Sequence, residues 1–199
     1  MQKIKDGQSY IEQTFSRLSL MDGDFSAVEF EDCAFEHCDF SGSTFARGQF
    51  IDCTFKHCNL SMMQVTGSRW FGVEFIECKL VGLDWTKADW PAFHRDSELS
   101  FKHCILNDAS FFGLTLQGLK LEECKCHEVD FREGDFSHAT MTHCDFSNSV
   151  FMRTNLSGCD FTESENFNIP VLENKLDGAS FSRFAALNLL YSLNIELVD

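Results

Sequence analysis

Four histidine–cysteine pairs are the residues in this sequence whose types and spacing could bind a metal, and they lie at 37–38, 57–58, 103–104 and 143–144. A zinc site needs about four such ligands that converge on the ion at ~2.0–2.3 Å. Adjacent side chains of an extended backbone point in opposite directions, so each pair should place its cysteine inside the fold and its histidine outside. We therefore expect the cysteines to fill space in a core, and we expect no metal and no cofactor.

Catalytic chemistry has no comparable set of residues in this chain. Acidic residues are plentiful, but they recur at the outer positions of a repeat, whereas acid–base catalysis needs them around a cleft. The glycines are scattered, and none belongs to the glycine-rich loop that binds phosphate. The sequence offers no catalytic residue, and we expect the protein not to be an enzyme.

The composition suits one acidic domain. The chain has 199 residues, a formal net charge of −15 and 22 phenylalanines against two tyrosines. Such a charge repels nucleic acid and attracts basic surfaces. No apolar run approaches the ~20 residues of a membrane span, and the opening MQKIKDGQSY does not resemble a secretory signal. With ten cysteines expected to stay reduced, we expect a cytoplasmic protein that binds neither nucleic acid nor membrane.

A period of five residues predicts the elements that position these side chains. Every fifth residue is apolar from Phe15 to Trp90, and again, in a shifted phase, from Phe101 to Phe161. The residue two positions before each of them is usually small, and most cysteines stand there. Two inward side chains in every five, on short strands joined by turns, predict a closed coil that stacks on its neighbours as in a β-solenoid. The predicted core includes Phe35, Phe40, Phe50, Phe55, Phe131, Phe136, Phe146 and Phe151.

This pattern resembles the pentapeptide-repeat family, whose consensus is roughly A(D/N)LXX. The matching segments are CDFSG at 38–42, CNLSM at 58–62, CDFSN at 144–148 and TNLSG at 154–158. The resemblance covers about residues 11–181 and implies an all-β fold, a right-handed quadrilateral β-helix with four five-residue sides in each coil. Stacked coils would then align Cys38 with Cys58 and Cys78, and would stack His37 on His57 at an outer corner. That corner is either solvated or a weak two-histidine metal site.

The predicted β-helix covers residues 1–181 and is interrupted at 91–100, where the phase shifts. Trp90 and Pro91 open this break, and we expect a local kink there. Residues 182–199 leave the repeat and predict a short C-terminal helix, with Ser182 as a candidate cap, followed by a short strand. This tail should either cap the solenoid or join two copies into a homodimer. The candidate dimerisation residues are Phe184, Leu187, Leu190, Tyr191, Leu193, Ile195 and Leu197.

Three longer segments narrow the resemblance to the topoisomerase-poison resistance proteins of this family, of the Qnr type and, most closely, of the albicidin-resistance type. They are FIECKLVGLDWTKADWP at 75–91, LSFKHCILNDASFFGLTLQGLKLEEC at 99–124 and LLYSLNIEL at 189–197. The resemblance implies a homodimeric DNA mimic that binds the GyrA DNA-binding saddle of DNA gyrase, or topoisomerase IV, and protects it from albicidin or quinolones. The alternative is an acidic scaffold for another basic partner. The candidate gyrase-facing residues are Asp32, Glu36, Asp52, Glu77, Asp130, Asp135 and Asp145.

Overall fold

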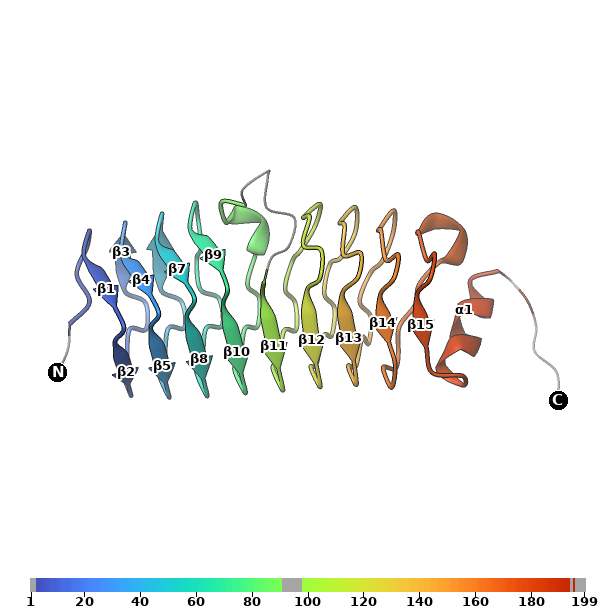
Figure 1. The fold of residues 1–199 in the computed structure, drawn as a ribbon, viewed down its shortest axis with the longest axis horizontal. Helices are drawn as coiled ribbons and strands as arrows, with labels where there is room; N and C mark the ends of the chain where they lie inside the picture. The colour runs from blue at the N-terminus through green and yellow to red at the C-terminus, as the bar shows by residue number, and fades with distance from the viewer. Residues whose placement is uncertain (1–2, 91–97, 194, 196–199) are drawn as a thin grey trace.

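The computed structural model describes residues 3–90, 98–193 and 195, and these residues form a rod of stacked coils with β1 near one end and α1 at the other (Figure 1). Each coil returns to the same side after 20 residues, so that Phe15, Phe35, Phe55 and Phe75 occupy equivalent positions in neighbouring parallel strands. The described residues thus form a parallel β-solenoid, which confirms the predicted fold class.

Each coil has four sides, which we number 1 to 4 in the order in which the chain passes along them, starting at β2. The four sides differ in how regular their strands are. Side 1 carries a nine-stranded sheet within the described residues, and side 4 carries a four-stranded sheet that continues as isolated bridges such as Asp135 with Asn155. Side 3 begins with a two-stranded sheet, and side 2 consists of isolated bridges such as Asp39 with Asn59. Side 1 comprises β2 (Thr14–Ser16), β5 (Ala34–Glu36), β8 (Thr54–Lys56), β10 (Glu74–Ile76), β11 (Ser100–Lys102), β12 (Lys120–Glu122), β13 (Thr140–Thr142), β14 (Asp160–Phe161) and β15 (Ser180–Phe181). Side 3 comprises β3 (Asp24–Ser26) and β6 (Thr44–Ala46), and side 4 comprises β1 (Ser9–Ile11), β4 (Glu29–Glu31), β7 (Gln49–Ile51) and β9 (Arg69–Phe71).

The segment CDFSG at 38–42 shows why the repeat folds this way. Cys38 and Phe40 are buried, while Asp39 Oδ1 accepts hydrogen bonds from the Ser41 amide (2.9 Å) and the Ser41 hydroxyl (2.6 Å). Gly42 turns the corner at a φ of +66°. Most corners carry a non-glycine residue at positive φ instead, a conformation that costs an L-residue about 1–2 kcal/mol. A hydrogen bond from the corner amide to the next coil, such as His37 N to Lys56 O (2.9 Å), offsets this strain.

The core is a set of stacked aromatic rings inside the coils. The eight phenylalanines that the sequence analysis placed in the core are each at most 1% exposed. Rings on one side stack coil upon coil, as Phe35 and Phe55 do at a centroid distance of 4.6 Å, and rings on adjacent sides meet edge to face, as Phe131 and Phe136 do. Such pairs contribute ~0.5–1.5 kcal/mol beyond the burial of their area.

The interruption adds six residues to one coil without breaking the stack. Phe75 of β10 pairs with Phe101 of β11, a step of 26 residues in place of 20. Trp85 opens a 3-10 helix, η1 (Trp85–Lys87), and its carbonyl accepts a hydrogen bond from the half-buried Trp90 indole at 2.8 Å. The predicted kink at Trp90–Pro91 lies partly outside the described residues, because Pro91 is not among them.

The rod ends in short helical segments, η2 (Val171–Glu173), η3 (Ala185–Leu187) and α1 (Asn188–Tyr191), the last being the single α-helix of the described residues. The predicted cap at Ser182 is wrong, because neither η3 nor α1 has a side-chain cap. The Ser182 hydroxyl instead donates to Glu163 Oε1 (2.9 Å) and accepts from the Glu163 amide (2.8 Å), which fastens the tail to the preceding coil. None of these helices is long and apolar enough to cross a membrane.

Candidate interaction surface

The cysteines lie inside the coils, where they act as small hydrogen-bonding groups. The backbone amides of Cys38, Cys58 and Cys78 each donate to the thiol of the next coil, at 3.3–3.5 Å. This column of cysteines continues across the interruption at 91–100, because the Cys78 amide donates to the Cys104 thiol. All ten cysteines are free and buried. Burial raises the pKa of the Cys53 and Cys159 thiols to about 12, so these groups stay protonated at neutral pH.

The histidines of the four pairs point outward. The rings of His37 and His57 stack at 4.7 Å with an angle of 7° between their planes, as the 20-residue spacing predicts. His57 Nδ1 lies 3.2 Å from Glu77 Oε2, and His103 Nδ1 lies 3.2 Å from Glu123 Oε2. Over the described part of the chain, no group of three or more histidine, cysteine or acidic side chains is arranged to hold a metal.

The seven acidic residues selected from the sequence do not share one face. Asp32 and Asp52 are exposed at the corner that follows side 4, Glu36 lies on side 1 at the end of β5, and Glu77 lies at the corner that follows side 1. The remaining three lie on three different sides: Asp130 on side 3, Asp135 on side 4 and Asp145 on side 2. A flat or groove-shaped partner therefore cannot contact all seven at once.

Besides Glu77, which contacts His57, three of these carboxylates are engaged within the protein. Asp130 pairs with Arg132 at 2.7 Å, and Asp135 accepts hydrogen bonds from Gln117 and Asn155, both at 3.0 Å. Partial burial acts to raise the pKa of the Asp145 carboxyl. Hydrogen bonds from Asn166 and Ser147 and the contact with His127 outweigh this effect and hold that pKa below its ordinary value. These groups stabilise the coils, and their charges are partly compensated.

An exposed row of negative charge is instead formed by Glu12, Asp32 and Asp52, which we call the acidic edge. These three residues are exposed and follow one another at 20-residue steps in consecutive coils, about 4.8 Å apart. No ion pair involves them among the described residues. The row is interrupted at Gly72, where a Cβ atom would collide with the Asp52 carboxylate, and Glu98 occupies the same corner of the next coil. Sequence reasoning omitted Glu12, although its spacing from Asp32 was a sufficient signal.

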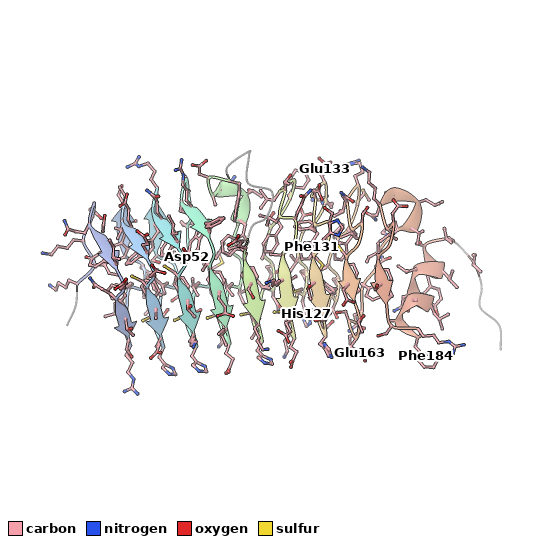
Figure 2. All side chains as sticks on the ribbon, in the orientation of Figure 1. Asp52, His127, Phe131, Glu133, Glu163 and Phe184 are labelled. Atoms are coloured by element: carbon pink, nitrogen blue, oxygen red, sulfur yellow. The ribbon has the colours of Figure 1, made fainter. Side chains whose placement is uncertain are left out.

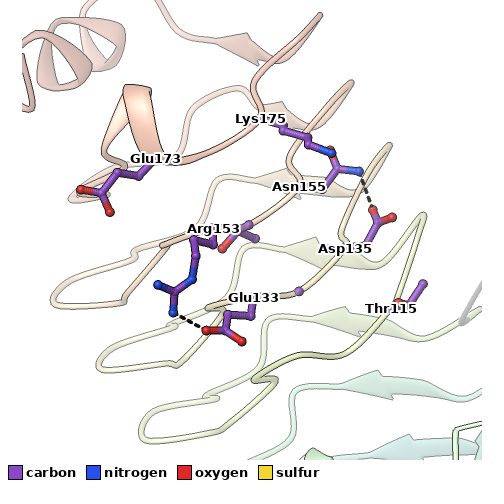
Figure 3. A pocket seen from close by; sticks show the side chains of 9 residues that line it. Thr115, Glu133, Asp135, Arg153, Asn155, Glu173 and Lys175 are labelled. Atoms are coloured by element: carbon purple, nitrogen blue, oxygen red, sulfur yellow. Dashed lines mark hydrogen bonds and ion pairs between the residues drawn. The ribbon is translucent and has the colours of Figure 1, made fainter.

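The hollow drawn in Figure 3 shows that the C-terminal half of side 4 is more balanced in charge. Its volume is about 420 Å³, and Arg153 pairs there with Glu133 while Asn155 donates to Asp135. Lys175 and Glu173 also line this hollow. Mixed charges of this kind attract a basic surface much less than the acidic edge does.

The C-terminal end of the rod exposes apolar side chains. Phe184 is 83% exposed, Tyr191 65%, Ile195 45% and Leu187 44%, whereas Leu190 and Leu193 are half-buried. Figure 2 shows Phe184 at this end, beyond the last coil, and the labelled Phe131 inside the rod. Leu197 lies outside the described residues. Exposed apolar groups gathered at one end are typical of an interaction site.

The fold and these surfaces define a β-solenoid with a packed interior and an acidic exterior. A family model described as "Pentapeptide repeat region" matches residues 28–99 and 96–161, and the chain belongs to this family. A search of curated protein sequences finds no match.

Solved structures share the fold over nearly the whole chain. A trypsin-treated variant of QnrB1, described as a plasmid-mediated fluoroquinolone resistance protein, is 24% identical with a TM-score of 0.69, covering 97% of this chain and 92% of that one. A second trypsin-treated QnrB1 variant is 22% identical with a TM-score of 0.70, covering 98% and 99% of the two chains. The full-length QnrB1 structure is 22% identical with a TM-score of 0.63, covering 94% and 100%.

Proposed function

We propose that this protein is a cytoplasmic DNA mimic that binds the DNA-binding saddle of DNA gyrase, or of topoisomerase IV, and protects the enzyme from poisons such as albicidin or quinolones. The observation that carries the proposal is the acidic edge on a rod of stacked coils. Family membership and the fold shared with a fluoroquinolone resistance protein support it.

The charge density of the rod is close to that of a nucleic acid. Eight steps of ~4.8 Å separate the first and last strands of side 1, which gives a length of about 40 Å. A net charge of −15 over this length is about one charge per 2.7 Å, and duplex DNA carries one per ~1.7 Å. A groove that binds DNA would therefore attract this rod by the same electrostatic force.

A homodimer is part of the proposal. The exposed apolar residues at the C-terminal end would be buried by a second copy through a two-fold axis. Two arms of about 40 Å, joined end to end, would give a rod of ~80 Å that presents one acidic edge on each arm.

A gyrase supercoiling assay with titrated protein tests the function. We expect the protein to restore supercoiling in the presence of albicidin or ciprofloxacin and to lower the amount of drug-stabilised cleavage complex. Inhibition without rescue would indicate a gyrase-binding mimic that does not protect. No effect on gyrase, with or without drug, would contradict the proposal and would favour a scaffold for another basic partner.

A further inference from the structure

A cysteine occupies the same inward position in each of several consecutive coils, and we call this row the thiol column. It consists of Cys38, Cys58, Cys78, Cys104, Cys124 and Cys144. Each of these side chains is at most 2% exposed. Leu18 and Ser164 stand at the same position in the coils on either side of the column, so the fold itself does not require cysteine there. The proposed action on gyrase gives no reason for such a row of thiols.

The thiols of the column all point the same way. Cys58 Sγ lies 3.3 Å from the Lys56 carbonyl oxygen of its own coil and 3.4 Å from the Phe35 carbonyl oxygen of the preceding coil. The other members repeat this pair of contacts at 3.2–3.5 Å. Because the orientation repeats, successive sulfur atoms are separated by the spacing of the coils, ~4.8 Å.

This spacing selects one kind of link between neighbouring thiols. It is far longer than the ~2.05 Å bond of a disulfide. A zinc site needs about four converging ligands, and the described residues contain no group of three or more suitable side chains arranged to hold a metal. Two metal–thiolate bonds of ~2.3 Å placed in line span ~4.6 Å, which is close to the coil spacing of ~4.8 Å. Two ligands in line are the preferred coordination of soft monovalent ions such as Cu⁺ and Ag⁺, and such ions prefer thiolate ligands.

Backbone amides already point at these sulfur atoms. The amides of Cys38, Cys58 and Cys124 donate to the sulfur of the next coil at 3.3–3.4 Å. A hydrogen bond to the charged form of an acid favours that form, so these amides favour the thiolate, which is the form that binds a metal. Fixed hydrogen-bond donors of this kind also hold metal ligands in place. The column therefore presents its sulfur atoms as oriented ligands.

We propose that the thiol column binds soft monovalent metal ions, Cu⁺ or Ag⁺, each held in line between the sulfur atoms of two successive coils. For each ion, two S–H bonds break and two metal–sulfur bonds form. Two protons leave to solvent, the site gains one net negative charge, and no electrons are transferred. If each thiol serves one ion, the column holds about three ions. This inference does not rest on the proposed action on gyrase.

Silver ion, added as its nitrate in a chloride-free buffer at neutral pH, is the probe that tests the proposal, and native mass spectrometry counts the bound ions. The reference protein is the full-length variant C53S/C126S. It lacks two thiols that lie near another cysteine, since Cys53 is one coil from Cys33 and Cys126 is two residues from Cys124. We expect it to bind about three silver ions and to release about two protons for each. Zinc, which needs about four ligands, should not bind to the column.

Two triple variants of the reference protein separate the spacing of the thiols from their number. Added C58S/C104S/C144S leaves three thiols two coils apart, at ~9.6 Å, which should abolish silver binding to the column. Added C104S/C124S/C144S leaves the same number of thiols in successive coils, which should retain about one ion. Serine suits these positions, because the Ser164 hydroxyl accepts from the Cys144 amide (2.9 Å) and donates to the Met141 carbonyl (2.6 Å). The two variants have the same exposed histidines and methionines, so silver bound at the surface affects them equally.

Three outcomes would overturn the proposal. They are a reference protein that binds no more silver than the variant with separated thiols, equal binding by the two triple variants, and zinc bound by the column in place of silver. If a triple variant does not fold, as judged by circular dichroism, C58S/C104S and C124S/C144S in the same background repeat the comparison. The first should retain about one ion and the second about two, and equal numbers would contradict the proposal.

Discussion

At the scale of single residues, the inward positions of the repeat carry the stability of this protein. Phe50 is fully buried, and its ring packs against rings of the coils on both sides and of its own coil. The distance between the ring centroids of Phe50 and Trp70 is 4.1 Å. The cysteines at the small inward positions are equally buried, and their thiols bond to the backbone. Both kinds of side chain contribute through packing.

Replacing Phe50 by alanine should lower the free energy of unfolding by about 3–5 kcal/mol, because it leaves a large cavity in a stacked column. The matched control is Phe112→Ala, since Phe112 is 41% exposed and contacts Arg132 at the surface. Urea denaturation of the two variants measures the difference. Equal losses at both positions would show that the assignment of inward and outward positions is wrong.

From the buried thiols of Cys53 and Cys159 we expect the protein to lose stability at alkaline pH. Burial raises the pKa of Cys53 and Cys159 to about 12 in the folded protein, against about 8.5 in an unfolded chain. The unfolded state therefore releases these protons first, and the stabilisation is complete below pH ~8.5 and is lost as the pH rises toward about 12. Urea midpoints between about pH 8 and 10.5 should fall in the unmodified protein and fall less in C53S/C159S. A drop of the same size in C53S/C159S would rule out these thiols as its source.

At the scale of elements, each side of the coil is closed by a turn whose polar groups come from the repeat itself. Asp145 is the most extensively bonded case, because its carboxylate reaches Ser147 in its own turn, His127 in the preceding coil and Asn166 in the following one. It therefore ties three coils together.

Asp145→Ala should cost about 1.5–3 kcal/mol, the usual range for hydrogen bonds to a charged group. Asp108→Ala, at an exposed corner, should cost much less. The lowered pKa of Asp145 also means that its contribution is present above the unfolded value of about 3.9 and is lost as the pH falls below it. The free energy of unfolding should therefore fall less steeply with decreasing pH in Asp145→Ala than in the unmodified protein, as acid unfolding followed by circular dichroism measures. An identical acid transition would exclude Asp145 as a source of acid sensitivity.

At the scale of the whole molecule, charge and shape determine the partners. The stack is continuous because consecutive coils keep the same register, even across the coil with six extra residues. Its negative charge is uncompensated along the acidic edge and more balanced near the hollow that contains Arg153 and Lys175. The proposed contact with gyrase should therefore depend on one edge more than on total charge.

Reversal of the acidic edge in E12K/D32K/D52K should abolish binding to gyrase, while each single reversal should weaken it little, because distributed surface charges contribute ~0–1 kcal/mol each. The matched control, D22K/D108K/E128K, makes the same change in net charge at another corner. Binding measured by surface plasmon resonance should also weaken with added salt. Equal losses in the two triple variants would show that only net charge matters.

From the exposed apolar side chains at the C-terminal end of the rod we expect a dimer. F184S/Y191S should convert a dimer into a monomer, because both side chains are exposed in one chain and would be buried between two. Phe112→Ser removes an exposed aromatic residue elsewhere and should leave the dimer intact. Sedimentation equilibrium at micromolar concentration measures both. A monomer in the unmodified protein would refute the two-fold rod.

The sequence alone determined what lies inside this protein and how often the chain turns. The large residue at every fifth position and the small residue two positions before it predict that Phe40 and Cys38 are buried, which follows from the local alternation of side chains. The 20-residue coil, which the resemblance to the pentapeptide-repeat family implies, adds that His37 stacks on His57.

Which outer residues act together depends on how the coils are placed against one another. Whether Asp145 is held by His127 and Asn166 depends on the register between coils and on side chains that meet across them. The sequence likewise could not show that Cys78 and Cys104 are neighbours, because the six extra residues could have ended the stack. An inward position is defined by a residue and its nearest neighbours along the chain, whereas a surface is defined by residues that hydrogen bonds between coils bring together.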